Sequence, residues 1–291
     1  MLTRRIQIVP YLLILPALTT LFFLFVYPIF WNIYLSLHDV QFATFREIWD
    51  FVGLDNYRVL IDDGLFPFKF RKSLSVSVAF VGGSILGQFV LGLALAMALR
   101  RRVRGTNLFR VVIAVPWILS ELVVAYIWLY LYQPTGAINS LGRMVGISPI
   151  PWLSSPDLAI WSLVLTNIWF GTPFSMLMMG SALTTIEPEM YEAAAIDGAN
   201  SRQAFRWITW PLLLPFVALN LMLITMWTVN LFALPLAMTK GGPVYATTTT
   251  SLYMYRYAFE FGNFSVGSSI GVMLFLFNIA AAVVYVRTLR R

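Results

Sequence analysis

The sequence contains no cysteine and only one histidine, His38. Without cysteine there can be no disulfides, no thiolate metal sites and no cysteine nucleophiles. One histidine and no HExxH-like spacing also exclude most zinc sites and most histidine-based catalysis. The sequence therefore predicts no catalytic residues, no metal ligands and no enzymatic activity of its own.

Charged residues are also scarce. Asp, Glu, Lys and Arg make up 11% of the 291 residues, against roughly a quarter in soluble domains. Hydrophobic residues make up 59%, and the mean hydropathy is +0.77. These values predict a protein whose solvent is the lipid bilayer. The net charge of +7 comes largely from arginines that flank apolar runs, which is typical of membrane topology and not of nucleic-acid binding.

Six apolar stretches are long enough to cross about 30 Å of hydrocarbon as helices. They cover residues 11–37, 73–99, 109–132, 158–183, 211–236 and 265–287. None shows the alternating pattern of an outer-membrane barrel. The first stretch is too long for the apolar core of a signal peptide, so we expect it to be retained as a membrane helix. The prediction is an all-α integral membrane protein with six transmembrane helices, forming a single domain over residues 1–291.

Basic residues near the helix ends predict which side of the membrane each loop faces. If both termini are cytoplasmic, the inner segments hold most of the Lys and Arg residues although they are the shorter segments. The inner basic residues are then Arg4, Arg5, Arg100, Arg101, Arg102, Arg104, Arg110, Arg202, Arg206, Arg287, Arg290 and Arg291. This density predicts a multi-pass protein with both termini in the cytoplasm.

The segment between the fourth and fifth stretches, EMYEAAAIDGANSRQAFRWITWP (189–211), is charged and rich in alanine. Pro188 suits the first turn of a helix and Gly198 suits a left-handed terminating position, so we expect a short helix over 188–197. Ser201 can cap a second short helix, which would meet the first at an angle. Periodicity alone is compatible with a helix pair that lies on the inner leaflet, with its aromatic residues at the acyl boundary.

The individual residues of this segment favour a different interpretation. Their spacing resembles the EAA loop of binding-protein-dependent ABC importer permeases, E-A-A-x3-G-x9-I-x-L-P, with Trp210 in place of the usual leucine. The matching residues are Glu192, Ala193, Ala194, Gly198, Ile208 and Pro211. Segments 51–63, 133–142 and 239–259 look like the carbohydrate branch of that family, the maltose and glycerol-phosphate type. The resemblance covers nearly the whole chain.

The resemblance implies that the 184–210 loop holds a coupling helix that sits in a groove of a separate ATPase subunit. The coupling residues would be the six matching residues together with Asp197, which like Glu192 offers charge to the partner. The implied partners are two copies of an ABC ATPase, a second permease that is a different chain, and an extracytoplasmic solute-binding protein. The implied location is a bacterial or archaeal cytoplasmic membrane.

The chain itself has no means of binding ATP through a Walker A loop, in which lysine follows glycine. Its only lysines are Lys69, Lys72 and Lys240, and none follows a glycine. We therefore expect no cofactor in this chain, with ATP and Mg²⁺ on the partner ATPase. The outer loops are likewise too short to form a domain that captures solute.

Candidate substrate residues lie in the fourth and fifth stretches, which line the central cavity in similar permeases. Asn167, Gly171 and Phe174 share one helical face that combines an amide, a backbone gap and an aromatic plane, a mixture suited to sugars. Thr228 and Asn230 complete the candidate pathway in the fifth stretch. The alternative is that these polar and small residues hold helices together.

Glu121 is the one carboxylate in the middle of a predicted span. Such groups are costly in a membrane and usually face a cavity or a partner. We include Glu121 in the substrate pathway, where it would bind sugar hydroxyls or contact the second permease. Snorkelling and burial in the protonated form are the alternatives.

No Lys or Arg lies in the middle of any span, which favours a neutral solute over an anionic one. The prediction is a permease that moves a neutral mono-, di- or oligosaccharide by alternating access. Uptake of glycerol-3-phosphate or another polyol or phosphodiester is the first alternative. An ion-coupled secondary carrier, with Glu121 as its proton site, is the second. A membrane enzyme acting on lipid would need a cluster of His, Asp, Glu or Ser at one depth, which the sequence does not offer.

Overall fold

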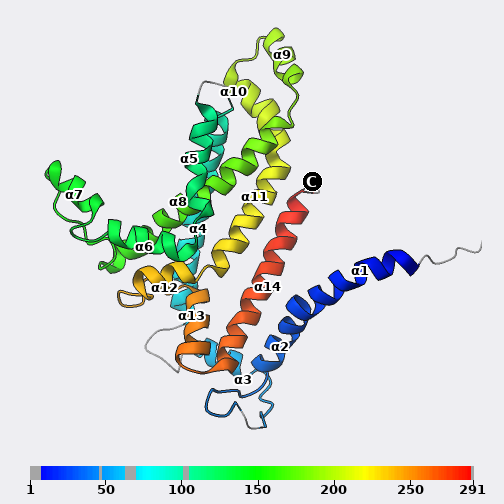
Figure 1. The fold of residues 1–291 in the computed structure, drawn as a ribbon, viewed down its shortest axis with the longest axis vertical. Helices are drawn as coiled ribbons and strands as arrows, with labels where there is room; N and C mark the ends of the chain where they lie inside the picture. The colour runs from blue at the N-terminus through cyan, green and yellow to red at the C-terminus, as the bar shows by residue number, and fades with distance from the viewer. Residues whose placement is uncertain (1–7, 46–47, 63–69, 101–104, 290–291) are drawn as a thin grey trace, which may run out of the picture. The chain divides into compact units, whose positions relative to one another are not determined.

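The computed structural model describes residues 8–45, 48–62, 70–100 and 105–289 of the chain (Figure 1). Within these ranges the chain is helical apart from loops and two isolated antiparallel bridges, one from His38 to Phe51 and one from Gln41 to Asn263. Seven of the arginines used to predict the orientation lie outside the described residues: Arg4, Arg5, Arg101, Arg102, Arg104, Arg290 and Arg291.

The chain divides into two compact units. The first comprises Met1–Leu65 and Met254–Met273, and the second comprises Phe66–Tyr253 and Leu274–Arg291. Five helices of the described chain are long and apolar enough to cross a membrane, or six if a bent pair counts as one span. This agrees with the all-α membrane protein that the sequence predicts.

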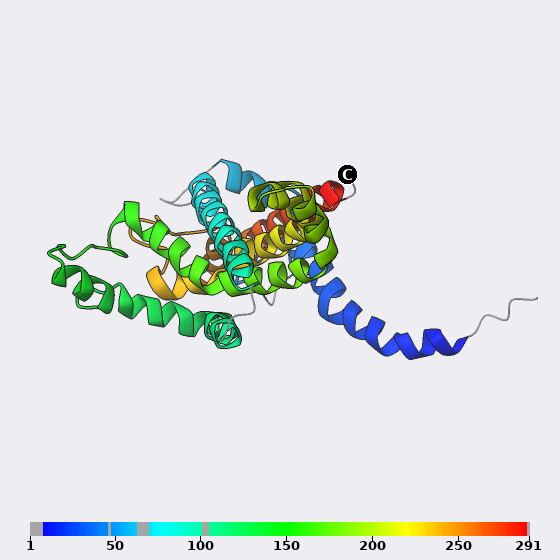
Figure 2. The same ribbon diagram turned by 90° about the horizontal axis from the view of Figure 1, so that it is seen from above.

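In the second unit, α4 (Phe70–Ala98) packs along α8 (Pro156–Thr184), and α11 (Trp210–Asn230) contacts both. Figure 2 shows these three helices clustered together, while α7 (Ala137–Met144) extends away from them. Glycines permit the close approach of α4 to α8. A Cβ on Gly87 would overlap Ile168, and a Cβ on Gly92 would overlap Ser175. Small residues at helix contacts are the usual way in which membrane helices pack closely.

The predicted span over 109–132 is a broken helix. The helix α5 (Thr106–Ile118) and the helix α6 (Glu121–Leu131) meet at 100°, so α6 lies nearly across α5 (Figure 1). The two linking residues are extended, and the Ser120 side chain accepts a hydrogen bond from the Val123 N–H at 3.3 Å. Ser120 is therefore an N-cap that starts a new helix, and Glu121 is the acidic residue of its first turn.

The fifth predicted span begins and ends earlier than 211–236. The continuous helix covers Ser201–Asn230, because α10 (Ser201–Ala204) passes through the π-turn η2 (Phe205–Thr209) directly into α11. The expectation of a separate second short helix was therefore wrong. Pro211 has no N–H to donate, and a π-turn accommodates such an interruption without ending the helix.

Both ends of this long helix differ in detail from the prediction. Its N-cap is Asn200, not Ser201, and Asn200 forms a reciprocal capping box with Gln203. At the other end Leu231 is extended, and a short helix, α12 (Ala233–Thr239), follows. The apolar run therefore continues beyond the helix end, which is why hydropathy alone overestimates its length.

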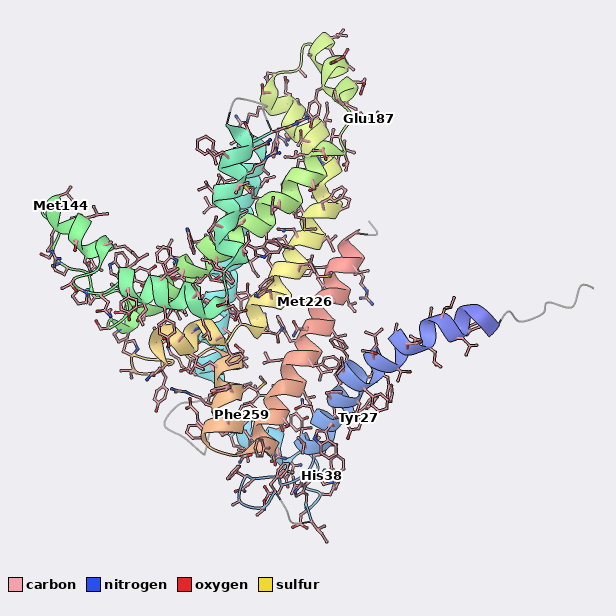
Figure 3. All side chains as sticks on the ribbon, in the orientation of Figure 1. Tyr27, His38, Met144, Glu187, Met226 and Phe259 are labelled. Atoms are coloured by element: carbon pink, nitrogen blue, oxygen red, sulfur yellow. The ribbon has the colours of Figure 1, made fainter. Side chains whose placement is uncertain are left out.

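The first unit is built on one long helical segment, in which α1 (Ile8–Leu21), the π-turn η1 (Phe22–Val26) and α2 (Tyr27–Ser36) follow without a break. Figure 3 marks Tyr27 on this segment and His38 just after it. The short helix α3 (Asp55–Ile61) is tied to the segment by Asn56, which donates to the carbonyls of Ser36 and His38 at 2.9 and 3.0 Å. His38 thus lies in a loop, where its carbonyl accepts a hydrogen bond that holds α3 in place.

The chain ends in helical segments as well. The helix α13 (Thr250–Tyr255) runs into the π-turn η3 (Arg256–Glu260), and α14 (Phe264–Leu289) is the last helix. Within the first unit, the Ser265 hydroxyl donates to the Val40 carbonyl at 3.1 Å and accepts from the Val40 N–H. Within the second unit, α14 meets α11 through the hydroxyls of Tyr285 and Thr225, which lie 3.0 Å apart.

Candidate functional site

Four of the six predicted substrate residues lie around one cavity in the second unit. Asn167, Gly171 and Phe174 reach it from α8, and Thr228 reaches it from α11. The other lining residues are Gln88, Trp117, Phe170, Ile224 and Trp227. In this conformation the space for water inside is about 20 Å³, which is room for roughly one molecule. A sugar ring enters only if the helices around the cavity move apart.

Gln88 is a lining residue that the sequence analysis missed. It comes from the middle of α4 and is only 3% exposed, and its Nε2 donates to the Asn167 carbonyl at 2.9 Å. Its amide group occupies the space that a Cβ on Gly171 would take. The signal in the sequence was a lone amide within an apolar stretch, where a polar side chain requires a partner.

Asn167 lines the cavity and carries a buried donor without a partner in the described part of the chain. The residue is 3% exposed, and its Nδ2 has no hydrogen-bond partner among the described residues. A buried donor without a partner costs about 1–3 kcal/mol. A ligand oxygen or a water that reached this position would remove that cost, which makes Asn167 a candidate to bind an acceptor such as a sugar hydroxyl.

Aromatic rings form the apolar part of the wall. The rings of Phe174 and Trp117 lie 5.7 Å apart between centroids, and those of Phe170 and Trp227 lie 6.3 Å apart in an edge arrangement. Aromatic rings combine a broad apolar face with a fixed orientation. Together with the amides of Gln88 and Asn167, they give the cavity the mixed polar and aromatic lining that suits a sugar.

Glu121 and Asn230, the other two predicted substrate residues, are not among the lining residues. Glu121 is half-buried at the start of α6, and its side chain lies next to the indole of Trp227, which does line the cavity. Asn230 is exposed at the end of α11, where it donates to the Met226 carbonyl at 2.7 Å and accepts a long 3.5 Å hydrogen bond from Asn278 of α14. Glu121 therefore borders the site, whereas Asn230 joins two helices.

The predicted coupling segment forms an exposed helix at one end of the second unit. Its helix α9 (Pro188–Ile196) has no buried residue along its fully described length. Figure 3 marks Glu187 where α9 begins. Glu192, Ala193 and Asp197 are exposed and Ala194 is half-buried. This surface is open to a partner.

Gly198 ends α9 as the sequence predicts. Its φ is +79°, a left-handed conformation that favours glycine. The Gly198 N–H donates to Ala195 at 3.1 Å and the Ala199 N–H donates to Ala194 at 2.8 Å, the bond pair of a Schellman motif. The remaining two coupling residues serve the connection to α11. Ile208 packs against the buried cluster of α8 and α11, and Pro211 lies in the first turn of α11.

Nothing in the described part of the chain suggests a metal centre, since no three His, Asp or Glu side chains gather there. The lining of the cavity consists of amides, a hydroxyl, aliphatic groups and aromatic rings. Such a lining can bind a polar solute but offers no group for covalent catalysis.

Comparisons with known proteins agree with this description. Residues 88–291 match the family model described as "Binding-protein-dependent transport system inner membrane component". The trehalose/maltose transport system permease protein MalF of Thermococcus litoralis is 34% identical over 280 residues, which cover 95% of this chain and 92% of the relative.

Two solved structures of bacterial alginate ABC transporters have a similar fold. One, described as involved in the import of the acidic polysaccharide alginate, superimposes with a TM-score of 0.82 at 20% identity, covering 97% of this chain and 95% of that one. The other is in complex with an alginate pentasaccharide-bound periplasmic protein, and it gives a TM-score of 0.79 at 20% identity, covering 96% and 92%.

Proposed function

The chain belongs to the family of binding-protein-dependent transport system inner membrane components, and from this premise we propose that it is the permease subunit of a sugar ABC importer. The observation that carries the proposal is the arrangement of the second unit. Asn167, Gly171, Phe174 and Thr228 meet at one cavity, and the same unit displays an exposed α9 with the residues of a coupling loop. In this proposal the solute binds in the cavity and the ATPase binds at α9, and both sites belong to the second unit.

The proposed partners follow from what the chain lacks. It has no lysine in a Walker A context, so ATP and Mg²⁺ are bound by two copies of an ABC ATPase, one of which docks on α9. A second permease, a different chain, completes the translocation path. An extracytoplasmic solute-binding protein delivers the sugar, as a periplasmic protein accompanies the alginate transporter. In this arrangement α9 and both termini face the cytoplasm.

The proposed substrate is a neutral mono-, di- or oligosaccharide. Among the described residues, no Lys or Arg lines the cavity, and a carboxylate, Glu121, borders it next to Trp227. An anionic solute usually requires a basic side chain or a helix N-terminus. The likeness to the alginate transporter supports the fold alone and does not extend an acidic cargo to this chain. The first alternative is glycerol-3-phosphate or another polyol or phosphodiester, for which the second permease would have to supply the cation.

The proposed mechanism is alternating access. With space for about one water, the cavity is too small for a sugar in this conformation. ATP binding would close the ATPases, move α9 and open the cavity to the binding protein. The sugar would then replace water at Asn167, and the Asn167 Nδ2 would gain a hydrogen-bond partner. ATP hydrolysis would then return the cavity to the state in which it opens to the cytoplasm. This chain performs no covalent step.

The test is uptake by the complete complex in membrane vesicles, with maltose, trehalose, an alginate pentasaccharide and glycerol-3-phosphate as solutes. We expect uptake of a neutral sugar that requires ATP and persists when an ionophore removes the proton gradient. Uptake that stops with the ionophore and survives ATP depletion would replace the importer by an ion-coupled carrier. Preference for the pentasaccharide or for glycerol-3-phosphate would overturn the neutral substrate and leave the importer intact.

A further inference from the structure

One side chain attaches the exposed helix α9 to the rest of the second unit at two points. Tyr191 is half-buried, and its hydroxyl lies 2.9 Å from the Thr209 hydroxyl. The Arg100 guanidinium lies over the Tyr191 ring, 4.3 Å from its centroid. The ring also packs against a buried cluster that includes Ala96 and Leu213. Hydrogen bonding, a cation–π contact and packing thus converge on one residue.

The contacts of Tyr191 lie on two different helices. Arg100 is the second residue after α4, which ends at Ala98, and Thr209 is the last residue of η2, which continues into α11. The helices α4 and α11 supply Gln88 and Thr228 to the cavity wall. Another helix of the wall, α8, is joined to α9 by the three residues 185–187. Tyr191 therefore connects α9 to α4, to which no adjacent loop joins it, and adds a side-chain contact with the helix that the 197–200 loop leads into and that continues as α11.

We propose that Tyr191 is a positioning residue that transmits movement of α9 to α4 and α11, and so opens the cavity. The inference rests on the proposed function, since it assumes that a partner moves α9. Without the Tyr191 contacts, only residues 185–187 and the 197–200 loop would connect α9 to the other described helices. These loops would bend when α9 is displaced, and α4 and α11 would not follow its movement. The hydrogen bond to Thr209 and the cation–π contact with Arg100 each contribute about 1 kcal/mol. Losing either one would change the equilibrium between the closed and open arrangements of the helices about fivefold.

Matched substitutions separate transmission from simple packing. Tyr191→Phe keeps the ring, its packing and the cation–π contact, and removes only the hydroxyl. Thr209→Val removes the other half of the same hydrogen bond with nearly the same volume. Tyr285→Phe is the control, because it removes the corresponding hydroxyl pair between Tyr285 and Thr225, which joins α14 to α11 and does not involve α9.

The absence of cysteine from the chain allows a readout that does not depend on knowing the sugar. Thr228→Cys places a single thiol in the cavity wall, where its reaction with a small water-soluble maleimide reports access. The complete complex, with its second permease and ATPase, is labelled without nucleotide and after trapping with ATP and vanadate. The ratio of the two labelling rates measures how far movement of the ATPase opens the cavity, and ATP hydrolysis is measured in parallel on untrapped complex.

We expect Tyr191→Phe and Thr209→Val each to reduce this ratio about fivefold while the ATPase stays bound and hydrolyses ATP. The double variant should be no worse than either single one, because both remove the same bond. Tyr285→Phe should keep the ratio within twofold of the parent. For the other contact, Arg100→Gln should reduce the ratio and Arg100→Lys should restore most of it, because a lysine ammonium can also lie over the ring.

Several results would overturn the inference. If both Tyr191→Phe and Thr209→Val kept the ratio of labelling rates of the parent protein, the hydroxyl pair would not transmit the movement of α9. Loss of bound ATPase from these variants would assign Tyr191 to docking and not to transmission. An equal loss in Tyr285→Phe would show a general loosening of the unit. By contrast, no nucleotide-dependent change in the parent itself would refute the proposed importer function and this inference with it.

Discussion

Substituting Gly171 by alanine tests how the cavity wall is held together. A Cβ at this position would come within 2.4 Å of the Gln88 amide, far closer than packed atoms approach each other, so the amide must move. It would then lose its 2.9 Å hydrogen bond to the Asn167 carbonyl, at a position that is buried in the parent protein. The added methyl thus acts through Gln88, on a neighbouring helix.

The expected change in the free energy of unfolding follows from two opposing contributions. Leaving the buried amide of Gln88 unpaired costs about 1–3 kcal/mol, and replacing a helical glycine by alanine contributes about 0.5–1 kcal/mol in the other direction. The expected net loss of stability lies between about 0 and 2.5 kcal/mol, with a central value of about 1 kcal/mol. Because the displaced amide moves into a cavity with space for about one water, we also expect KM for uptake to rise about tenfold.

The assay combines thermal unfolding of the purified complex with uptake in vesicles. Gly171→Ala should lower Tm and raise KM. Adding Gln88→Ala to Gly171→Ala should recover much of the Tm, because it removes the side chain with which the methyl collides. Gly180→Ala is the control, since it lies on the same helix and nothing among the described residues lies within 4 Å of its added Cβ. An unchanged Tm and KM in Gly171→Ala would refute the packing argument.

Three further predictions concern single elements of the site. Asn167→Ala should weaken uptake about tenfold, measured as KM, with complex assembly and basal ATP hydrolysis unchanged; parental uptake would remove Asn167 from the pathway. Glu192→Lys and Gly198→Asp should abolish ATP-driven uptake, either by loss of the co-purified ATPase or by hydrolysis without transport, and normal uptake in both would exclude α9 as the coupling helix. Ser120→Ala removes the N-cap of α6 and should destabilise the complex by about 1 kcal/mol in thermal unfolding, whereas an unchanged Tm would show that the bend is held by packing alone.

The sequence predicts those features that depend on one helix at a time. Apolar length gives the membrane helices, because a helix must satisfy its backbone within the bilayer. The helical period brings Asn167, Gly171 and Phe174 to one face, and the structure places all three at one cavity. Pro188 and Gly198 mark the two ends of α9 because both act through the local backbone.

Features that depend on contacts between helices could not be predicted in the same way. The role of Gln88 arises from the close packing of α4 on α8, and nothing in its own neighbours along the chain identifies its partner. Ser120 and Glu121 look like polar residues inside an apolar span, although they form the start of a helix. The helix that ends at Asn230 is followed by further apolar residues, so hydropathy does not mark its end.

Affinity purification of this chain from its native membrane in mild detergent, followed by mass spectrometry of the proteins that accompany it, tests the importer assignment. We expect to recover an ABC ATPase, a second permease and a solute-binding protein, and that binding protein can then be screened for its sugar. Recovery of the chain without any ATPase, in several detergents, would refute the importer and leave an ion-coupled carrier as the better explanation.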